Sequence, residues 1–279
     1  MSVLHCGRFR LPLDRPLVMG IVNLTPDSFS GDGTGGDVAR AIRHARHQFD
    51  AGADILDIGA ESSRPGAIPT PEVEELRRLI PVLREVSGWG VPVSVDTYKP
   101  DVMRAALEAG ATMINDISAL SHPGAVDIVA ASDCAVCLMH MAGEPGTMQQ
   151  APRYDDVVCA VRDFLDVRVS LCRAAGIADS RIVLDPGLGF GKTLAHNLAL
   201  FRALTATGVD ELPVLIGASR KSMLGAITGR PVEGRMAASI AAALLAAQKG
   251  AKILRVHDVA ETIDALAVLA AVNEEGSLQ

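Results

Sequence analysis

Residues 18–30, VMGIVNLTPDSFS, change character at a single position. Residues 18–22 form an apolar run with the length and composition of a strand that is buried on both faces. The run ends at Asn23, after which residues 25–28 have the composition of a turn. A strand followed by a turn is common in isolation, but the rest of the chain repeats the pattern. We therefore interpret the stretch as a buried strand that delivers a side-chain amide, and then a loop, to one end of a barrel.

Chain length and charge limit the classes of protein that need to be considered. With 279 residues and 29.2 kDa, we expect a single domain over 1–279, made of an N-terminal segment, 1–15, and an α/β barrel, 16–273. The net charge of -7 and an aromatic content of 3% argue against nucleic acid as a partner. The longest apolar run, 236–247, is shorter than the roughly 20 residues that span a bilayer, so we expect no membrane segment.

The N-terminus and the cysteines indicate the compartment. Residues 1–10 lack the apolar core of a signal peptide, so we expect a cytoplasmic protein. Five cysteines without framework spacing fit reduced thiols there. Cys134 and Cys137 match a C-x-x-C pair, but they begin an apolar run and no second pair follows for zinc, so we interpret them as structural.

Strand-like and helix-like segments alternate along the chain after a short stretch, 3–15, that could form a hairpin. Three of the helix-like segments end in a glycine, at Gly52, Gly110 and Gly250, where a left-handed residue would turn the chain into the next strand. This repeat predicts a (β/α)8 TIM barrel. The apolar runs expected to form its strands are 17–22, 55–59, 92–95, 113–114, 135–139, 182–184, 214–218 and 253–256.

Two of the expected helices have clear patterns. The first, 70–86, would have Thr70 as its N-cap, Pro71 at its first position and a kink at Pro81. The second, 154–175, has apolar residues at spacings of three and four. The expected apolar faces are Val73, Leu76, Ile80 and Leu83 in the first helix, and Val158, Val161, Leu165, Val169 and Cys172 in the second.

Polar residues end or follow nearly every apolar run. The active site of a parallel barrel lies at the carboxyl ends of its strands, so these residues are expected to reach it. A single Asp or Asn could equally be the N-cap of the next helix, but capping does not explain polar residues after nearly every strand. They are Asn23, Asp57 with Glu61, Asp96, Asn115 with Asp116, His140, Asp185, Ser219 with Arg220 and Lys221, and Arg255 with His257.

The chemistry of these residues indicates a site with two halves. Asp96, Asn115 and Asp185 supply acceptors and an amide, which suit the edge of a heterocycle that carries N–H donors beside a carbonyl. A second group suits a phosphate-type anion together with a divalent metal, for which Asn23 offers a hard oxygen ligand. This group is Asn23, Arg64, Arg255 and His257.

Two other motifs have competing interpretations. Residues 187–193 resemble a phosphate-binding loop, but Pro186 stands where its first glycine would be, which argues against an NTPase. Lys221 could form a Schiff base, whereas its neighbours Arg220 and Ser222 suit anion binding equally well.

Seven motifs, spread over nearly the whole chain, resemble those of the dihydropteroate synthase family, each at the expected strand end. The first two are the most specific to that family. The motifs are MGIVNLTPDSFS at 19–30, DIGAESSRPGA at 57–67, PVSVDT at 92–97, INDIS at 114–118, LDPGLGFGK at 184–192, GASRKS at 217–222 and RVHDV at 255–259.

The resemblance implies a transferase that condenses 6-hydroxymethyl-7,8-dihydropterin pyrophosphate with 4-aminobenzoate, giving 7,8-dihydropteroate and pyrophosphate in folate synthesis. It also implies inhibition by sulfonamides, Mg2+ as cofactor and a homodimer, for which the small apolar residues of 237–247 are a candidate interface. By motif position, Asp96, Asn115, Asp185, Lys221 and Arg255 would bind the pterin; Asn23, Ser63, Arg64, Arg255 and His257 the pyrophosphate; Asn23 the metal; and Phe29, Ser63, Arg64, Pro65, Phe190, Lys221 and Ser222 the aminobenzoate.

Two alternatives remain within reach of these motifs. One is a methyltetrahydrofolate-dependent corrinoid methyltransferase, which would be expected to lack the S-R-P-G and S-R-K-S elements. The other is a non-catalytic pterin-binding paralogue, in which losses would be expected among Asn23, Arg64, Lys221 and His257. All four residues are present.

Two glycine-containing loops, after the first and second strands, are expected to close over the site and exclude water. The first carries the acids Asp27 and Asp32. The family's F-S-D-G-G is here Phe29-Ser30-Gly31-Asp32-Gly33, so the second acid is displaced by one residue, and we expect Asp32 still to serve closure. The second loop has Ser63 where the family commonly has Thr, which keeps the hydroxyl.

Overall fold

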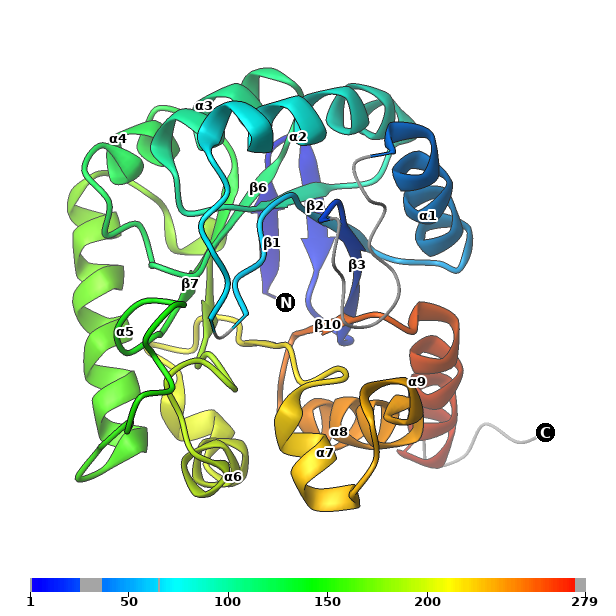
Figure 1. Ribbon diagram of the computed structural model, residues 1–279, viewed down its shortest axis with the longest axis vertical. Coiled ribbons are helices and arrows are strands. Elements are labelled where there is room, and N and C mark those ends of the chain that lie inside the picture. The colour runs from blue at the N-terminus through cyan, green and yellow to red at the C-terminus, as the bar shows by residue number, and fades with distance from the viewer. Residues whose placement is uncertain (1, 26–36, 65, 274–279) are drawn as a thin grey trace.

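The computed structural model describes residues 2–25, 37–64 and 66–273. In this part of the chain, eight parallel strands form one sheet in the order β8-β7-β6-β5-β4-β3-β10-β9. A bridge between Leu184 of β8 and Val214, just before β9, joins the two edges into a nearly closed barrel, as predicted (Figure 1). The strands are β3 (Leu17–Asn23), β4 (Ile55–Gly59), β5 (Val93–Asp96), β6 (Met113–Asp116), β7 (Ala135–Met139), β8 (Ile182–Asp185), β9 (Leu215–Ile216) and β10 (Ile253–Val256).

Helices surround the barrel (Figure 1). Gly52, Gly110 and Gly250 follow helix ends with φ of 95°, 104° and 88°, which confirms the predicted left-handed turns into the next strands. The helices are α1 (Val38–Asp50), α2 (Glu72–Val86), α3 (Pro100–Glu108), α4 (Ala125–Ala130), α5 (Val157–Ala174), α6 (Leu194–Arg202), α7 (Ser222–Thr228), α8 (Met236–Gln248) and α9 (Val259–Asn273).

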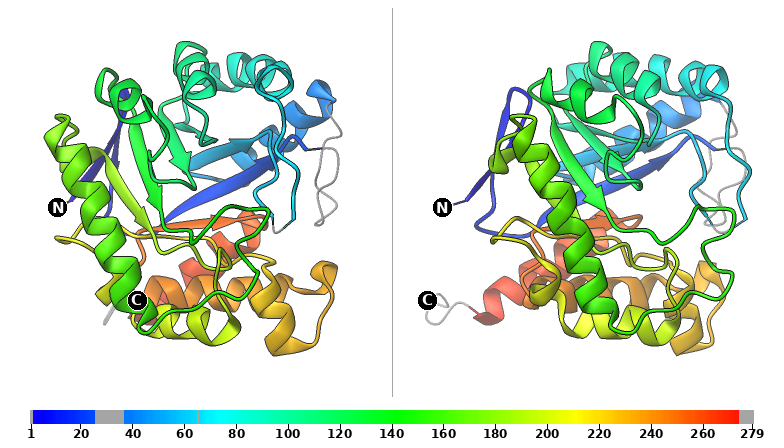
Figure 2. Two further views of the ribbon diagram at one scale, coloured as in Figure 1. Left: turned by 60° about the vertical axis from the view of Figure 1, so that its left-hand side comes forward. Right: turned by 90° about the vertical axis from the view of Figure 1, so that its left-hand side faces the viewer.

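The predicted N-terminal hairpin is present as the antiparallel pair β1 (Val3–Cys6) and β2 (Phe9–Pro12). It lies at the amino ends of the barrel strands, whereas the loops gather at the opposite end (Figure 2). Leu4 and Cys6 are buried with apolar side chains from the barrel interior, including Met19 and Ile55. The hairpin therefore closes the end of the barrel that is remote from the predicted site.

The predicted helix 70–86 is wrong at its start and in part of its apolar face. α2 begins at Glu72, and Thr70 makes other contacts: its N–H donates to Glu61 and its carbonyl accepts from Lys99. Val73 is 80% exposed. The helix continues across Pro81, and its buried residues are Glu75, Leu79, Val82, Leu83 and Val86.

Other predictions are confirmed with small changes. α5 begins at Val157 rather than Tyr154, with Asp156 as its N-cap, and four of the five predicted apolar residues are buried, with Val158 half-buried. Cys134 and Cys137 are free, buried thiols, as the structural interpretation requires. Among the described residues, no helix is long and apolar enough to cross a membrane.

Candidate functional site

A cavity of about 450 Å³ opens at the carboxyl ends of the barrel strands. Its volume suits a ligand of the size of a heterocycle with substituents. Phe29, Pro65, Asp27 and Asp32 lie outside the described residues. Every other residue to which the family resemblance gives a ligand lines the cavity: Asn23, Ser63, Arg64, Asp96, Asn115, Asp185, Phe190, Lys221, Ser222, Arg255 and His257.

The alternation of strand side chains explains why these residues meet. Residues two apart on a strand point to the same face. In β8, Val183 lies in the buried interior cluster, so Asp185 points into the barrel as well, one level closer to the cavity. In β10, Ile253 and Arg255 have the same relation. The lower level of the interior is therefore apolar and the level above it is polar.

Arg255 is the centre of a buried charge network. Its Nε donates to Asp57 Oδ2 at 2.6 Å and its Nη2 to Asp96 Oδ2 at 2.9 Å. The amide of Asn115 also donates to Asp57, at 3.4 Å. Burial raises the pKa of Asp96 to about 7, although the positive charge of Arg255 opposes the shift. Burial alone would lower the pKa of Arg255, but Asp57 and Asp96 outweigh it and raise that pKa.

Asp185 and Lys221 are opposite charges that both line the cavity and influence each other electrostatically. Asp185 accepts a hydrogen bond from Gly187 N–H at 2.7 Å. Burial raises the pKa of Asp185, and Lys221 opposes that shift. Burial lowers the pKa of Lys221 to about 8. The Lys221 ammonium donates to the Leu188 carbonyl and lies 4.8 Å from the centroid of the Phe190 ring, so the loop after β8 fixes its position.

The loop 187–192, which resembles a phosphate loop in sequence, has a structural role here. The Lys192 ammonium donates to the carbonyls of Gly187 and Phe190, both at 2.9 Å, and lies 2.9 Å from Nδ1 of His140. At Gly187, φ is +68° and an added Cβ would lie 1.9 Å from the His140 carbonyl oxygen. Burial lowers the pKa of Lys192 to about 7. Lys192 thus holds the loop that carries the Phe190 ring.

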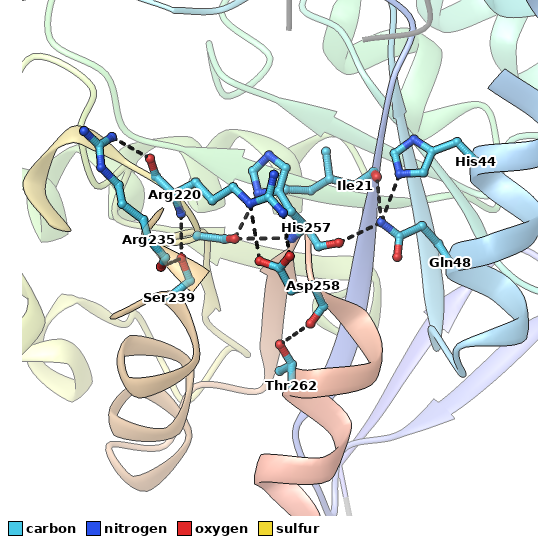
Figure 3. Close-up of polar contacts among 10 residues, drawn as sticks. Ile21, His44, Gln48, Arg220, Arg235, Ser239, His257, Asp258 and Thr262 are labelled. Atoms are coloured by element: carbon cyan, nitrogen blue, oxygen red, sulfur yellow. Dashed lines mark hydrogen bonds and ion pairs between the residues drawn. The ribbon is translucent and has the colours of Figure 1, made fainter. Parts of the chain in front are cut away.

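A second half of the cavity lies near the ends of β3 and β10. Nδ1 of His257 is 2.9 Å from Ser219 Oγ, which orients the imidazole. Arg220 pairs with Asp258, and Arg235 of the segment before α8 donates to the Arg220 carbonyl at 3.0 Å (Figure 3). Cations and hydrogen-bond donors therefore gather on this side, as expected for an anion site.

Three of the strand-end residues do not line the cavity. Asp57 is fully buried below it and pairs with Arg255. Asp116 follows the inward Asn115 and points away, where it accepts from Ser118 N–H and Leu120 N–H, both at 2.7 Å. Asp116 therefore neither enters the cavity nor caps the next helix, because Gly124 is the N-cap of α4. His140 lies beside Lys192 instead, and burial lowers its pKa to about 3.

Sequence reasoning named Glu61 but missed its ion cluster, and it missed part of the cavity lining. Lys99 pairs with Glu61 and, at 2.7 Å, with Glu75, an ion cluster that ties the loop after β4 to α2. The sequence carried no signal for this contact, since the three residues lie on three different elements. Further lining residues, such as Arg235, Met139 and Met148, were also missed. Of these, only Met139 was foreseeable, because it ends an apolar run.

Together, fold and site define an α/β barrel whose cavity, at the carboxyl ends of the strands, suits a polar ring beside an anion. The family model of pterin binding enzymes matches residues 19–257. The dihydropteroate synthase of Escherichia coli strain K12 is 47% identical over 262 residues, which cover 94% of this chain and 93% of the relative. That of Neisseria meningitidis serogroup C is 51% identical and covers 95% of each chain.

Solved structures give the same result. Dihydropteroate synthase of Burkholderia cenocepacia, complexed with 7,8-dihydropteroate, has 52% identity and a TM-score of 0.90, covering 97% of this chain and 96% of the other. The Xanthomonas albilineans enzyme with 4-aminobenzoic acid has 52% identity and a TM-score of 0.92, with 99% of each chain covered. The Yersinia pestis enzyme, in a sulfonamide drug complex, has 45% identity and a TM-score of 0.94, covering 97% and 99%. The chain belongs to the dihydropteroate synthases, a family of pterin-binding transferases.

Proposed function

We propose that this protein joins 6-hydroxymethyl-7,8-dihydropterin pyrophosphate to 4-aminobenzoate, with release of pyrophosphate and 7,8-dihydropteroate. The observation that carries the proposal is the convergence, in one cavity, of a ring-binding half and an anion-binding half. The names of the relatives agree with this reaction. The complete set of Asn23, Arg64, Lys221 and His257 argues against a non-catalytic paralogue, and the S-R-P-G and S-R-K-S elements argue against a corrinoid methyltransferase.

The ring half would bind the pterin through Asp96, Asn115, Asp185 and Lys221. A carboxylate such as Asp185 can accept two N–H bonds from the amino group and ring nitrogen of a pterin, and Lys221 can donate to its carbonyl. Asp57 and Asp96 hold the Arg255 guanidinium in one orientation, so it is preorganised to lie along the ring.

The anion half would bind the pyrophosphate through Asn23, Ser63, Arg64, Arg255 and His257. All five line the cavity, and they come from the ends of two strands and from the loop after β4. Side-chain amide, hydroxyl, guanidinium and imidazole groups together supply donors for several phosphate oxygens.

Mg2+ fits this half, though only with help from the substrate. The described residues contain no cluster of three acidic, histidine or cysteine side chains that could hold a metal. Asn23 offers one hard oxygen, and phosphate oxygens and water would complete the coordination that Mg2+ prefers. When bound, the ion would neutralise charge on the departing pyrophosphate.

The aminobenzoate would lie nearer the opening, against Ser63, Arg64, Phe190, Lys221 and Ser222, with Phe29 and Pro65 as further contacts from the two loops. The Phe190 ring, on the loop whose backbone Lys192 holds, offers an apolar face to the arene. The Arg64 and Lys221 cations and the Ser222 hydroxyl suit its carboxylate.

The reaction needs no protein nucleophile. The bond between the pterin methylene and the pyrophosphate oxygen breaks first, because the electron-rich ring stabilises the resulting cation and Arg255 and His257 stabilise the departing charge. The arylamine nitrogen then attacks the methylene carbon and loses a proton. Lys221 is committed to the Leu188 carbonyl and the Phe190 ring, which favours a binding role for it over a Schiff base.

The test is an assay of the purified protein with Mg2+ and both substrates. We expect equal amounts of pyrophosphate and 7,8-dihydropteroate, and neither product when one substrate is omitted. A non-catalytic paralogue would bind pterin and release nothing. The order of bond cleavage and bond formation is tested separately, with the oxygen between the methylene and the pyrophosphate labelled by ¹⁸O. In the absence of aminobenzoate the label should move to non-bridging positions, and a label that stays in place would exclude cleavage before attack.

We further propose a homodimer in which α8 and α9 form the interface. The buried residues of α8 are Ser239, Ala242, Ala243 and Ala246, while Met236 and Leu245 are 40% and 50% exposed. On α9, Val268 is 65% exposed. Light scattering at micromolar concentration should give twice the chain mass, and a monomer mass would refute the dimer. A single domain in the cytoplasm, where the five free cysteines stay reduced, completes the proposal.

A further inference from the structure

Gln48, on the inner face of α1, makes contacts that the mechanism does not use. Its side chain is 2% exposed. Its Nε2 donates to two backbone carbonyls, that of Ile21 in β3 at 3.2 Å and that of His257 after β10 at 2.9 Å (Figure 3). One amide therefore connects three elements that are far apart in sequence.

The position of these carbonyls explains why they need an outside donor. The registered pairing of β10 with β3 ends at Val256 and Gly20. Leu17 N–H donates to the Lys252 carbonyl, so the backbone N–H and carbonyl groups of the odd-numbered residues in β3 point toward β10. The Ile21 carbonyl therefore points to a place that lies beyond the end of β10. The Gln48 amide takes the place of the missing strand donors.

Close packing brings the amide to this point. An added Cβ at Gly20 would lie 3.2 Å from Gln48 Cβ and 3.1 Å from Val259 Cγ2. Because Gly20 has no side chain, α1 can approach β3 closely enough for a glutamine side chain to span both strands. A buried amide that did not meet both carbonyls would be costly, so the geometry defines its position closely.

We propose that Gln48 is a positioning residue for the pyrophosphate half of the site. Asn23 lies two residues after Ile21, and His257 itself carries the second carbonyl, so the amide sets the spacing between these two anion ligands. The inference rests on the proposed function. It assigns to Gln48 an effect on the anion rather than on the pterin edge, because Asp96, Asn115 and Asp185 lie on β5, β6 and β8, and Arg255 is held by its own pairs with Asp57 and Asp96.

The experiment compares Gln48→Met with wild type, because methionine has a similar length and no donor. Calorimetry with inorganic pyrophosphate and Mg2+ should show affinity lower by about fivefold, as expected from two buried carbonyls that lose their donor. KM for pterin pyrophosphate should rise by a similar factor. Affinity for 6-hydroxymethylpterin, which lacks the anion, should stay within about twofold.

Thr112→Val is the matched control. Thr112 is also buried, and its hydroxyl accepts from Val93 N–H at 3.0 Å and bonds the Val93 carbonyl at 3.3 Å, at the opposite end of the barrel. This variant should lower the melting temperature and leave pyrophosphate affinity unchanged. If Gln48→Met behaves like Thr112→Val, Gln48 is only structural and the inference is wrong.

Two further outcomes are distinguishable. If Gln48→Met does not fold, Gln48→Asn decides, since its shorter amide cannot span both carbonyls: unchanged pyrophosphate affinity in that variant would overturn the inference. If wild type itself binds no pyrophosphate with Mg2+, the proposed function fails before Gln48 is tested.

Discussion

Two interior levels of the same barrel differ sharply in chemistry, although they are only two residues apart on each strand. The lower level packs against the hairpin and is apolar, and the upper level carries most of the charge of the site. The lower level consists of Met19, Ile55, Met113, Cys137, Val183, Leu215 and Ile253, with Ser94 of β5 as a polar exception, and the upper level of Ile21, Asp57, Asp96, Asn115, Met139, Asp185, Gly217 and Arg255.

The difference shows how one strand pattern serves stability and chemistry together. Apolar side chains in the lower level stabilise the folded state simply by leaving water. The buried charges above them are tolerable only because they are paired, as Arg255 is with Asp57 and Asp96. The stability contributed by the lower level therefore offsets the cost of burying polar groups in the upper level.

The largest effect is expected at the centre of the polar level. Arg255→Met leaves Asp57 and Asp96 buried without their cation, so the free energy of unfolding should fall by about 4 kcal/mol and pterin binding should be lost. Denaturant unfolding and calorimetry measure the two quantities. Arg77→Met, which breaks the exposed pair with Glu74, is the control and should leave the free energy of unfolding nearly unchanged. Equal costs in the two variants would remove the distinction.

The lower level should affect stability alone. Leu4→Ala creates a cavity beneath the barrel and should cost about 3 kcal/mol, while pterin affinity stays within about twofold. The control is Val73→Ala at an exposed position on α2, which should change neither quantity. A loss of affinity in Leu4→Ala at a temperature where the protein is folded would show that the two levels are coupled.

The opposite separation is expected for Asp185→Asn. The amide keeps the shape but loses the charge that two N–H donors of the pterin would meet, so pterin affinity should fall at least about tenfold, or 1.4 kcal/mol, in calorimetry. Unfolding free energy should change little, since burial already raises the pKa of this carboxyl and disfavours its charge. Unchanged pterin affinity would remove Asp185 from the site.

The last effect concerns the pH dependence of stability. Burial lowers the pKa of Lys192 to about 7, so between that pH and the ordinary value of about 10.4 the unfolded chain binds more protons than the folded one. Stability relative to Lys192→Met should therefore rise as pH increases from 7 to 9, by at most about 1.4 kcal/mol per unit. Unfolding curves at several pH values test this. A difference that is flat or falls with pH would mean that Lys192 stays charged in the folded protein.

Much of the fold was predictable because its signals are local. Apolar runs, the hairpin and the glycines after three helices depend on neighbouring residues only. The start of α2 was not, because Thr70 is drawn away by Glu61 and Lys99 from other elements. Val73 fits a helical period, yet the barrel meets α2 on the side of Glu75 and Leu79.

The sequence predicted which residues gather at the site, but not which of them line the cavity and which hold other residues in place. Alternation implies that Asn115 and Asp116 point to opposite sides, but only the barrel shows which side is inside. Asp57 lies below the cavity because Arg255 covers it. Arg255 is on β10, which is separated from the strand of Asp57, β4, by β3. Lys192 and Lys221 both follow glycine-containing motifs. Only the packing of the loop 187–192 on His140 shows that Lys192 holds this loop in place and that Lys221 is the site residue.

The most direct test of the two-level account is a crystal structure with pterin pyrophosphate and Mg2+ bound. We predict that the pterin edge meets Asp185 and Asn115 of the upper level, with Arg255 along the ring and the pyrophosphate near Asn23 and His257. A ring bound outside this level, or a reversed ligand with pyrophosphate beside Asp185, would contradict the account.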